Sequence, residues 1–249
     1  MIIKGVIEAP RVAVSFPSVL IAEAAHDLHQ ARMRVGDVLA APIWSHTGPE
    51  YEENRREWSE HGEREAIIAW LYLRTYGVPS HVKVDADPVD LMMGFILHDI
   101  GKTETMKPHM RFLLKEQLTA DDMADIRRHV EAGEHILFQY EKHAGVHLPA
   151  MMRDIVLFHH EQLDGSGYPH NLSGQHLNFF GRLAACIDQL VGRTERRPYH
   201  TRNITLREAV EDVEALPHKY DKEILKNLRR MFESNMHLAV GMEEMWRWE

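Results

Sequence analysis

Histidine and aspartate residues recur along this chain at intervals of about 30 residues, and this spacing constrains the fold more than any other feature. The pair His98–Asp99 ends an apolar segment, and His129 follows this pair by 30 residues. The pair His159–His160 begins a further 30 residues on, and Asp188 comes 28 residues after it. One helix and its return need about this length, so successive helices can bring these side chains to one centre. The spacing predicts a helical bundle with metal ligands in its interior.

Apolar residues at helical spacing extend through most of the chain. Helices are expected over 52–76, 88–100, 119–142, 149–162, 176–194, 205–215 and 219–235. The alternation typical of strands is nearly absent from this part of the sequence. We therefore expect an all-α fold with one compact domain over 52–235.

A small N-terminal extension, 1–51, and a C-terminal tail, 236–249, are expected to flank this domain. In the extension, β-branched runs at Met1–Ile7 and Val12–Phe16 predict a short strand or hairpin, followed by a helix over 18–34. Glycines and prolines predict a loop over 36–50. The tail could form a final helix, and its two tryptophans leave a homodimer open.

The composition is that of a soluble globular protein. Hydrophobic residues make up 44% and charged residues 27% of the 249 residues. The net charge of −9 argues against a nucleic acid polymer as a partner, because duplex binding needs a basic surface. Cys186 is the only cysteine, the N-terminus lacks a signal pattern, and no stretch approaches the roughly 18 apolar residues of a membrane span. We expect a cytoplasmic protein without a membrane partner.

The segment LMMGFILHDIGK (91–102) places an imidazole and a carboxylate together at the end of an apolar helix. Adjacent helical residues point about 100° apart, so this pair suits two metal ions better than one, with Asp99 bridging them. Lys102 would then lie about one turn further on, near a phosphate held at the metals. A polar helix end is the plain alternative for the dipeptide alone. The downstream ligands favour the metal site.

Neighbouring His159 and His160 are again expected to address two different ions. Upstream, Glu57 and His61 lie four residues apart and therefore on one helical face, where they could supply a third metal position. An exposed charged helix explains that pair equally well. Cys186, two residues before Asp188, is expected in the core. The other histidines are expected on the surface or directed away from the site: His81, His135, His143, His147, His170 and His176.

The loop LDGSGYPHNLSG (163–174) follows the two neighbouring histidines closely. Gly167 would allow a close backbone approach to a ligand. Tyr168 and Pro169 would fix an aromatic ring that can stack on a base or bind a phosphate. Asp164 could support a ligating histidine, although a simple turn cap explains it as well.

Taken together, HDIGK at 98–102, His129, HHEQLDGSGYP at 159–169 and Asp188 resemble the HD-GYP phosphodiesterases. RPY at 197–199 and the stretch 118–137 around the middle histidine are also similar to that family, and the resemblance covers about 57–230. The chain departs from the pattern at 115–117, where Lys-Glu-Gln stands in place of Lys-Pro-Gly. Residues 1–51 are too few to hold the receiver or sensor domain that such proteins usually carry.

The resemblance implies an HD-domain helical bundle with two or three divalent metal ions, often iron or manganese. It implies hydrolysis of a cyclic dinucleotide, chiefly cyclic di-GMP, to a linear dinucleotide or GMP by a hydroxide that bridges the metals. Asp99 and Lys102 would be catalytic, and Lys102, Gly167, Tyr168 and Pro169 would contact the substrate. The implied metal ligands are Glu57, His61, His98, Asp99, His129, His159, His160 and Asp188.

Two other functions stay open. Another nucleotide phosphohydrolase of the HD superfamily would keep His98, Asp99 and Asp188 but would not need the loop with Tyr168. A non-catalytic receptor for a cyclic dinucleotide is the second alternative. Retention of every assignable ligand favours catalysis.

Overall fold

The structure is a computed structural model that describes residues 8–9, 12–13, 18–42, 49–83, 87–106, 119–195 and 204–234. Side-chain positions are described from residue 20 onward within these ranges, except at 21 and 49–57. Two short antiparallel strands, β1 (Glu8–Ala9) and β2 (Val12–Ala13), lie near the N-terminus. The helices are α1 (Ser18–Ala40), α2 (Pro49–Tyr76), α3 (Pro88–Leu97), α4 (Lys102–Thr105), α5 (Ala120–Arg127), α6 (His129–Ala144), α7 (Ala150–Phe158), the 3₁₀ turn η3 (Gly174–His176), α8 (Phe179–Thr194), α9 (Leu206–Glu214) and α10 (Lys222–Glu233).

The all-α prediction is confirmed, and the hairpin predicted at the N-terminus is present in part. Ala9 pairs with Val12, whereas the run Met1–Ile7 lies outside the described residues. The tail 236–249 and the RPY motif at 197–199 also lie outside them. The division into an extension, a domain and a tail stays a prediction. No described helix is long and apolar enough to cross a membrane.

The predicted loop over 36–50 is wrong at both ends, because α1 continues to Ala40 and α2 begins at Pro49, while residues 43–48 lie outside the described residues. Gly36 favours a break in the helix, yet Val35 and Val38 on either side of it are buried. Burial of this helical face outweighs the intrinsic cost of a glycine, which is only about 1 kcal/mol. Tertiary packing therefore overrides the local signal.

Two other predicted helices divide in the structure. The helix expected over 88–100 ends at Leu97, and a turn then leads into the short helix α4. The helix expected over 119–142 divides between α5 and α6 at Arg128. Both divisions occur next to a predicted ligand, His98 in the first case and His129 in the second.

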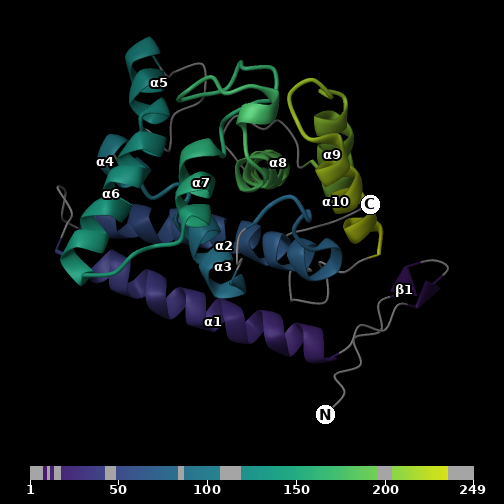
Figure 1. The fold of residues 1–249 in the computed structure, drawn as a ribbon, viewed down its shortest axis with the longest axis horizontal. Helices are drawn as coiled ribbons and strands as arrows, with labels where there is room; N and C mark the ends of the chain where they lie inside the picture. Colours follow the sequence, from purple (N-terminus) through teal and green to yellow (C-terminus); the bar gives the residue numbers. More distant parts are fainter. Residues whose placement is uncertain are drawn as a thin grey trace.

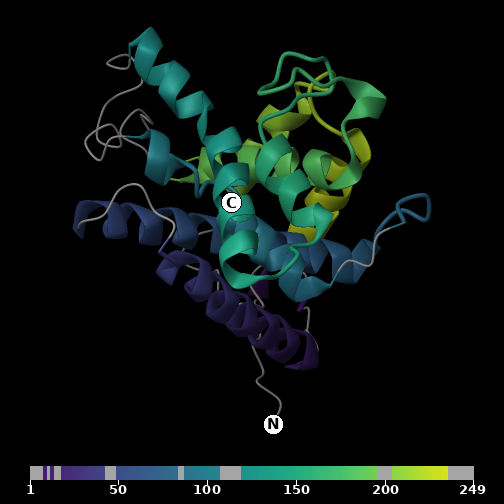
Figure 2. The ribbon, with the colours of Figure 1, turned by 60° about the vertical axis from the view of Figure 1, so that its left-hand side comes forward.

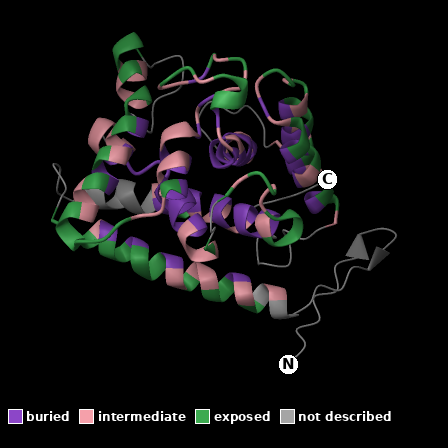
Figure 3. Ribbon diagram, in the orientation of Figure 1, coloured by how far each residue is buried: buried purple, intermediate pink, exposed green. Residues whose placement is uncertain are grey.

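Four helices form the centre of the molecule: α2 packs on α3, α3 on α7, α7 on α8 and α8 on α2. Figures 1 and 2 show α1 running along the outer side of α2 and α3, while α9 and α10 lie beyond α8. Buried residues concentrate in the inner helices (Figure 3), including Trp70 on α2, Phe95 on α3 and Phe180 on α8. Ala31 of α1 is buried in the same core, so this helix belongs to it.

The N-terminus of α3 is capped, and this fixes the position of the His98–Asp99 pair, which follows the last residue of the helix. The side chain of Asp87 accepts hydrogen bonds from the backbone N–H groups of Val89 at 2.8 Å and Asp90 at 3.1 Å. Pro88 occupies the first helical position, where a missing N–H costs nothing. All seven residues from 91 to 97 are buried, so the helix cannot slide along its axis without exposing apolar surface.

Candidate metal centre

Two close helix contacts at glycines bring the ligand-bearing segments together. A Cβ atom at Gly101 would lie 1.9 Å from the carbonyl oxygen of His129, so only glycine lets the turn after α3 rest on the start of α6. A Cβ atom at Gly62 would lie 2.4 Å from the carbonyl oxygen of Phe95. Helix α2 therefore crosses α3 just as closely, one residue after His61. These contacts set the separation of the side chains on either side of them.

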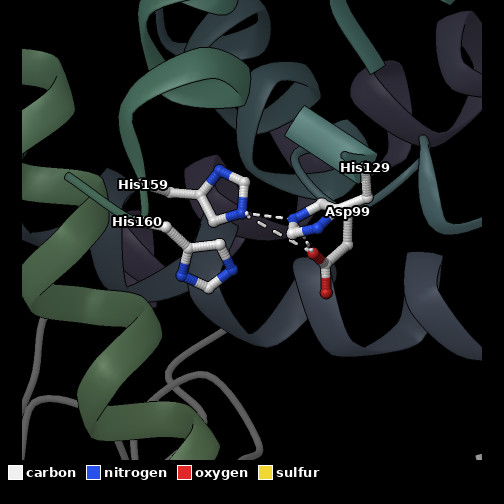
Figure 4. A group of neighbouring side chains, drawn as sticks. All are labelled: Asp99, His129, His159 and His160. Atoms are coloured by element: carbon white, nitrogen blue, oxygen red, sulfur yellow. Dashed lines mark hydrogen bonds and ion pairs between the residues drawn. The ribbon is translucent and has the colours of Figure 1, made fainter. Parts of the chain in front are cut away.

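The first group of converging side chains is Asp99, His129, His159 and His160. In Figure 4 the two consecutive histidines approach from one side, and Asp99 and His129 from the other. The Oδ1 atom of Asp99 lies 3.1 Å from Nε2 of His129 and 3.6 Å from Nε2 of His159. The two Nε2 atoms are 3.0 Å apart. His160 lies beside them, with its ring centroid 4.1 Å from that of His159.

Backbone carbonyls orient three of the imidazoles in the same way. The Nδ1 atom lies 2.7 Å from Phe95 O in His98, 2.5 Å from Ile126 O in His129 and 2.9 Å from Val156 O in His159. Each carbonyl belongs to the residue three positions earlier. A carbonyl oxygen only accepts, so each Nδ1 must donate, and Nε2 carries the free lone pair. This is the tautomer and the ring orientation that a metal-binding histidine needs.

The second group is His61, Glu65, His98 and Asp188. The Nε2 atom of His61 lies 3.1 Å from Oε1 of Glu65 and 3.8 Å from Oδ1 of Asp188. The Nδ1 atom of His61 contacts Oε1 of Glu195 at 2.6 Å, so its Nε2 also faces the group. All four members are buried. Candidate ligand atoms within each group lie no more than 4.8 Å from one another.

Both aspartates reach from one group to the other. Asp99 turns Oδ1 to His129 and Oδ2 to Nε2 of His98, at 3.5 Å. Asp188 turns Oδ1 to His61 and Oδ2 to Nδ1 of His160, at 3.6 Å. The two groups are therefore neighbouring halves of one centre that share carboxylates.

Unsatisfied polar atoms show that these residues fit divalent cations. Among the described residues, four buried ligand atoms of this centre have no hydrogen-bond partner: His61 Nε2, Glu65 Oε1, His98 Nε2 and Asp99 Oδ1. Such atoms are rare in native proteins, because leaving one buried and unpaired costs roughly 1–3 kcal/mol. Imidazole and carboxylate together form a mixed nitrogen and oxygen set that suits iron, manganese or zinc better than calcium.

Burial and charge prepare these groups for that role. Burial lowers the pKa of His98 to about 3 and also lowers the pKa values of His129 and His160, which keeps these three imidazoles neutral. At His61, burial is outweighed by the nearby carboxylates, chiefly Glu65, and the pKa is raised. Burial alone would raise the pKa values of Asp99 and Asp188. The surrounding imidazoles, together with Lys102 in the case of Asp99, outweigh that effect and hold both pKa values well below the usual range. Neutral imidazoles and charged carboxylates are the forms that bind metals.

Lys102 and Tyr168 border the first group. Lys102 forms an ion pair with Oδ2 of Asp99. The ring of Tyr168 lies 4.7 Å from that of His160 at an interplanar angle of 30°, and burial raises the pKa of its hydroxyl well above its usual value. The guanidinium of exposed Arg127 lies 5.5 Å from the centre of the Tyr168 ring. A cation and an aromatic ring therefore flank the ligands.

The loop after the two histidines is held by the protein itself. The carboxylate of buried Glu161 accepts hydrogen bonds from the backbone N–H groups of His170 at 2.6 Å and Leu172 at 2.9 Å. A Cβ atom at Gly167 would lie 2.5 Å from Cα of Glu161. The glycine therefore allows close packing of the chain on itself, and its contact with a substrate stays a prediction. Pro169 is half-buried in the same loop.

Asp164 is a turn cap, the simpler of its two interpretations. Its Oδ1 accepts hydrogen bonds from the backbone N–H and the hydroxyl of Ser166, at 2.9 and 2.6 Å. Cys186 is fully buried, as predicted. The histidines predicted on the surface or directed away from the site are exposed: His81, His135, His143, His147, His170 and His176.

Glu57 belongs to α2, but its side chain lies outside the described residues. Sequence reasoning missed Glu65, one turn after His61, although the same four-residue spacing would have found it. It also missed Glu195 and Arg127. Neither belongs to a ligand motif, and only the structure places them against His61 and Tyr168.

The HD domain family matches residues 80–224. The cyclic di-GMP phosphodiesterase PA4108 of Pseudomonas aeruginosa is 32% identical over 42% of this chain and 23% of its own length. The 3'3'-cGAMP-specific phosphodiesterase 2 of Vibrio cholerae is 30% identical over 59% of this chain and 26% of its own length. The chain thus spans about a quarter of these curated relatives.

Among solved structures, Bd1817, an HDG"Y"P protein from Bdellovibrio bacteriovorus, has a similar fold. The TM-score is 0.58 at 14% identity, and the match covers 88% of this chain and 74% of that one. The family match covers more than half of the sequence and includes every ligand candidate of the two groups except His61 and Glu65. It also includes the loop with Tyr168. The chain belongs to the HD domain family.

Proposed function

We propose that this protein is a metal-dependent phosphodiesterase of the HD-GYP type that hydrolyses a cyclic dinucleotide, with cyclic di-GMP as the first candidate. The observation that carries the proposal is the contact between His129 and His159. Both rings donate Nδ1–H to carbonyls, so in their neutral forms two Nε2 lone pairs face each other at 3.0 Å. A cation held by these two histidines and Asp99 would relieve that repulsion.

The two groups would hold two cations, the first on Asp99, His129, His159 and His160 and the second on His61, His98 and Asp188. Bound divalent cations would lower the pKa of a water molecule and offset charge on the phosphoryl oxygens. Asp99 would serve both positions through its two oxygens. Iron and manganese are the metals we favour, because the ligands mix imidazole with carboxylate. Glu57 would supply a third position.

Substrate contacts would come from the residues that border the first group. Lys102 can turn from Asp99 to a phosphate, and its charge would stabilise the negative charge that develops on the phosphoryl oxygens. Tyr168 offers a ring for stacking and a hydroxyl that stays protonated and can donate a hydrogen bond. Exposed Arg127 adds a cation behind that ring. An anionic substrate with bases and phosphates matches this set, and the relatives named above act on cyclic dinucleotides.

The test is a product assay on protein purified without oxygen and loaded with Fe²⁺ or Mn²⁺. Cyclic di-GMP, 3'3'-cGAMP and mononucleotides are offered separately, and the products are resolved by chromatography. We expect a linear dinucleotide or GMP from the cyclic substrates. Asp99→Asn should lose both metal and activity, whereas Lys102→Met should keep the metal and lose roughly 100-fold or more in rate. Glu63→Gln serves as the control, because the Glu63 carboxylate pairs with Arg32 on the surface. This variant should keep both the metal and the activity.

The same assay separates the two alternatives. Hydrolysis of mononucleotides alone would identify another HD-type phosphohydrolase. Binding of a cyclic dinucleotide without turnover, in protein shown to contain its metal, would identify a receptor. Either outcome would refute the proposed activity. A homodimer and a cytoplasmic location stay predictions.

A further inference from the structure

Glu65 carries a buried carboxylate and is not among the metal ligands expected from the sequence. It lies on α2 one turn after His61 and is 1% exposed. Residues four apart share a helical face, so its side chain points with His61 towards the end of α3. A carboxylate is among the groups that are almost never fully buried unless they are paired. The groups that pair with the Glu65 carboxylate therefore indicate its role.

The contacts of Glu65 all lie within the second group. Its Oε1 faces Nε2 of His61 at 3.1 Å without forming a hydrogen bond, and its Oε2 lies 3.5 Å from Nδ1 of His98. That Nδ1 already donates to the Phe95 carbonyl at 2.7 Å. Asp188 approaches His61 from α8. The described residues therefore offer Glu65 neighbours but no complete hydrogen bond for Oε1.

A simple buried ion pair with His61 does not account for this arrangement. Taking both charges out of water costs several kcal/mol per ion, which is regained only when the remaining polar atoms are also satisfied. Here Oε1 of Glu65 and Nε2 of both His61 and His98 lack hydrogen bonds. Moreover, Nδ1 of His61 is already engaged by Glu195, which fixes Nε2 in the direction of Glu65. The Nε2 atoms of His61 and His98 and the carboxylates of Glu65 and Asp188 therefore converge on one position.

We propose that Glu65 is a direct ligand of the second cation, together with His61, His98 and Asp188. The inference rests on the metal-binding part of the proposed function but not on its phosphodiesterase activity. It gives the centre two unlike halves. The first half has three imidazoles and one carboxylate, and the second has two imidazoles and two carboxylates. Carboxylates favour manganese and magnesium, whereas imidazoles favour iron and zinc, so the second half should hold Mn²⁺ better than a site without Glu65.

The test compares Glu65→Gln with the wild-type chain by metal content after saturation with Mn²⁺ and gel filtration. Glutamine keeps the size of the side chain and removes its charge. Glu63→Gln is the matched control, because it removes the same charge from the same helix at a position paired with Arg32. We expect Glu65→Gln to contain one equivalent of Mn²⁺ fewer than wild type, while Glu63→Gln matches wild type. Electron paramagnetic resonance should change from a coupled pair to an isolated Mn²⁺ ion.

Thermal unfolding of the metal-free proteins shows whether Glu65→Gln still folds, so that a loss of metal can be separated from a loss of structure. Glu65→Gln should unfold at or above the wild-type temperature, because an uncompensated buried charge is gone, and it should gain less stability when Mn²⁺ is added. If saturating Mn²⁺ restores the full metal content in Glu65→Gln, then Glu65 only orients His61 and the proposal is overturned. If the wild-type protein binds no metal, both this inference and the proposed function fail. If Glu65→Gln loses one ion but wild type cleaves no cyclic dinucleotide, only the proposed activity fails.

Discussion

Replacing Gly101 by alanine probes the contact that holds Asp99 next to His129. A Cβ atom at this position would lie 1.9 Å from the carbonyl oxygen of His129, whereas real Cβ atoms essentially never approach closer than 3.0 Å. The turn after α3 and the start of α6 must therefore separate by roughly 1.1 Å. Overpacking of this kind costs about 1–3 kcal/mol. A shift of about 1 Å between reacting groups costs roughly 100-fold in rate.

The expected result is a loss of roughly 2–12 °C in Tm, at about 2–4 °C per kcal/mol for a domain of this size, together with weaker metal binding. Gly36→Ala is the matched control. Gly36 lies in helix α1, where no atom stands within 4 Å of the place that a Cβ atom would occupy. Alanine at this position should stabilise the protein by about 0.5–1 kcal/mol. Calorimetry and metal analysis of both variants provide the measurement. An unchanged Tm and metal content in Gly101→Ala would refute the argument that this contact sets the ligand spacing.

Two further predictions concern metal and pH. Removing the metals with a chelator should lower Tm by roughly 5–11 °C, because a ligand at 100 times its Kd contributes about 2.7 kcal/mol, and an unchanged Tm would argue against a bound metal. Burial lowers the pKa values of His98, His129 and His160, so the unfolded chain takes up protons below pH about 6.5 that the folded metal-free protein does not. Its free energy of unfolding should therefore fall between about pH 6.5 and pH 4, by up to about 1.4 kcal/mol per pH unit for each histidine. The raised pKa of Glu65 offsets part of this fall, whereas the raised pKa of His61 acts mainly above pH about 6.5. Urea titrations that show greater stability at pH about 4 than at pH about 6.5 would contradict the prediction.

The spacing of the ligands carries much of the information about the fold and the site. Intervals of about one helix and its return correctly indicated that the segments around His98, His129, His159 and Asp188 meet. The helices were predictable because apolar periodicity persists even where the boundaries move. The continuation of α1 to Ala40 was not predictable, since burial of α1 against α3 outweighs the signal of Gly36.

The neighbourhood of His61 shows where sequence reasoning ends. Glu57 lies one turn before this histidine and Glu65 one turn after it, and the helical period treats the two alike. What distinguishes Glu65 is the close crossing of α2 over α3 at Gly62, which brings the following turn against His98. Glu195 comes just after the end of α8, where no periodic pattern applies. Such contacts depend on distances between helices, which a single sequence does not contain.

The anchoring of three imidazoles by main-chain carbonyls has an evolutionary consequence. An acceptor that belongs to the backbone remains in place whatever side chain occupies that residue, so no point mutation at Phe95, Ile126 or Val156 can delete it directly. Descendants of this chain could therefore exchange those side chains freely for others of similar bulk and still inherit correctly aimed rings. Mutational robustness of the ring orientation follows from helical geometry alone.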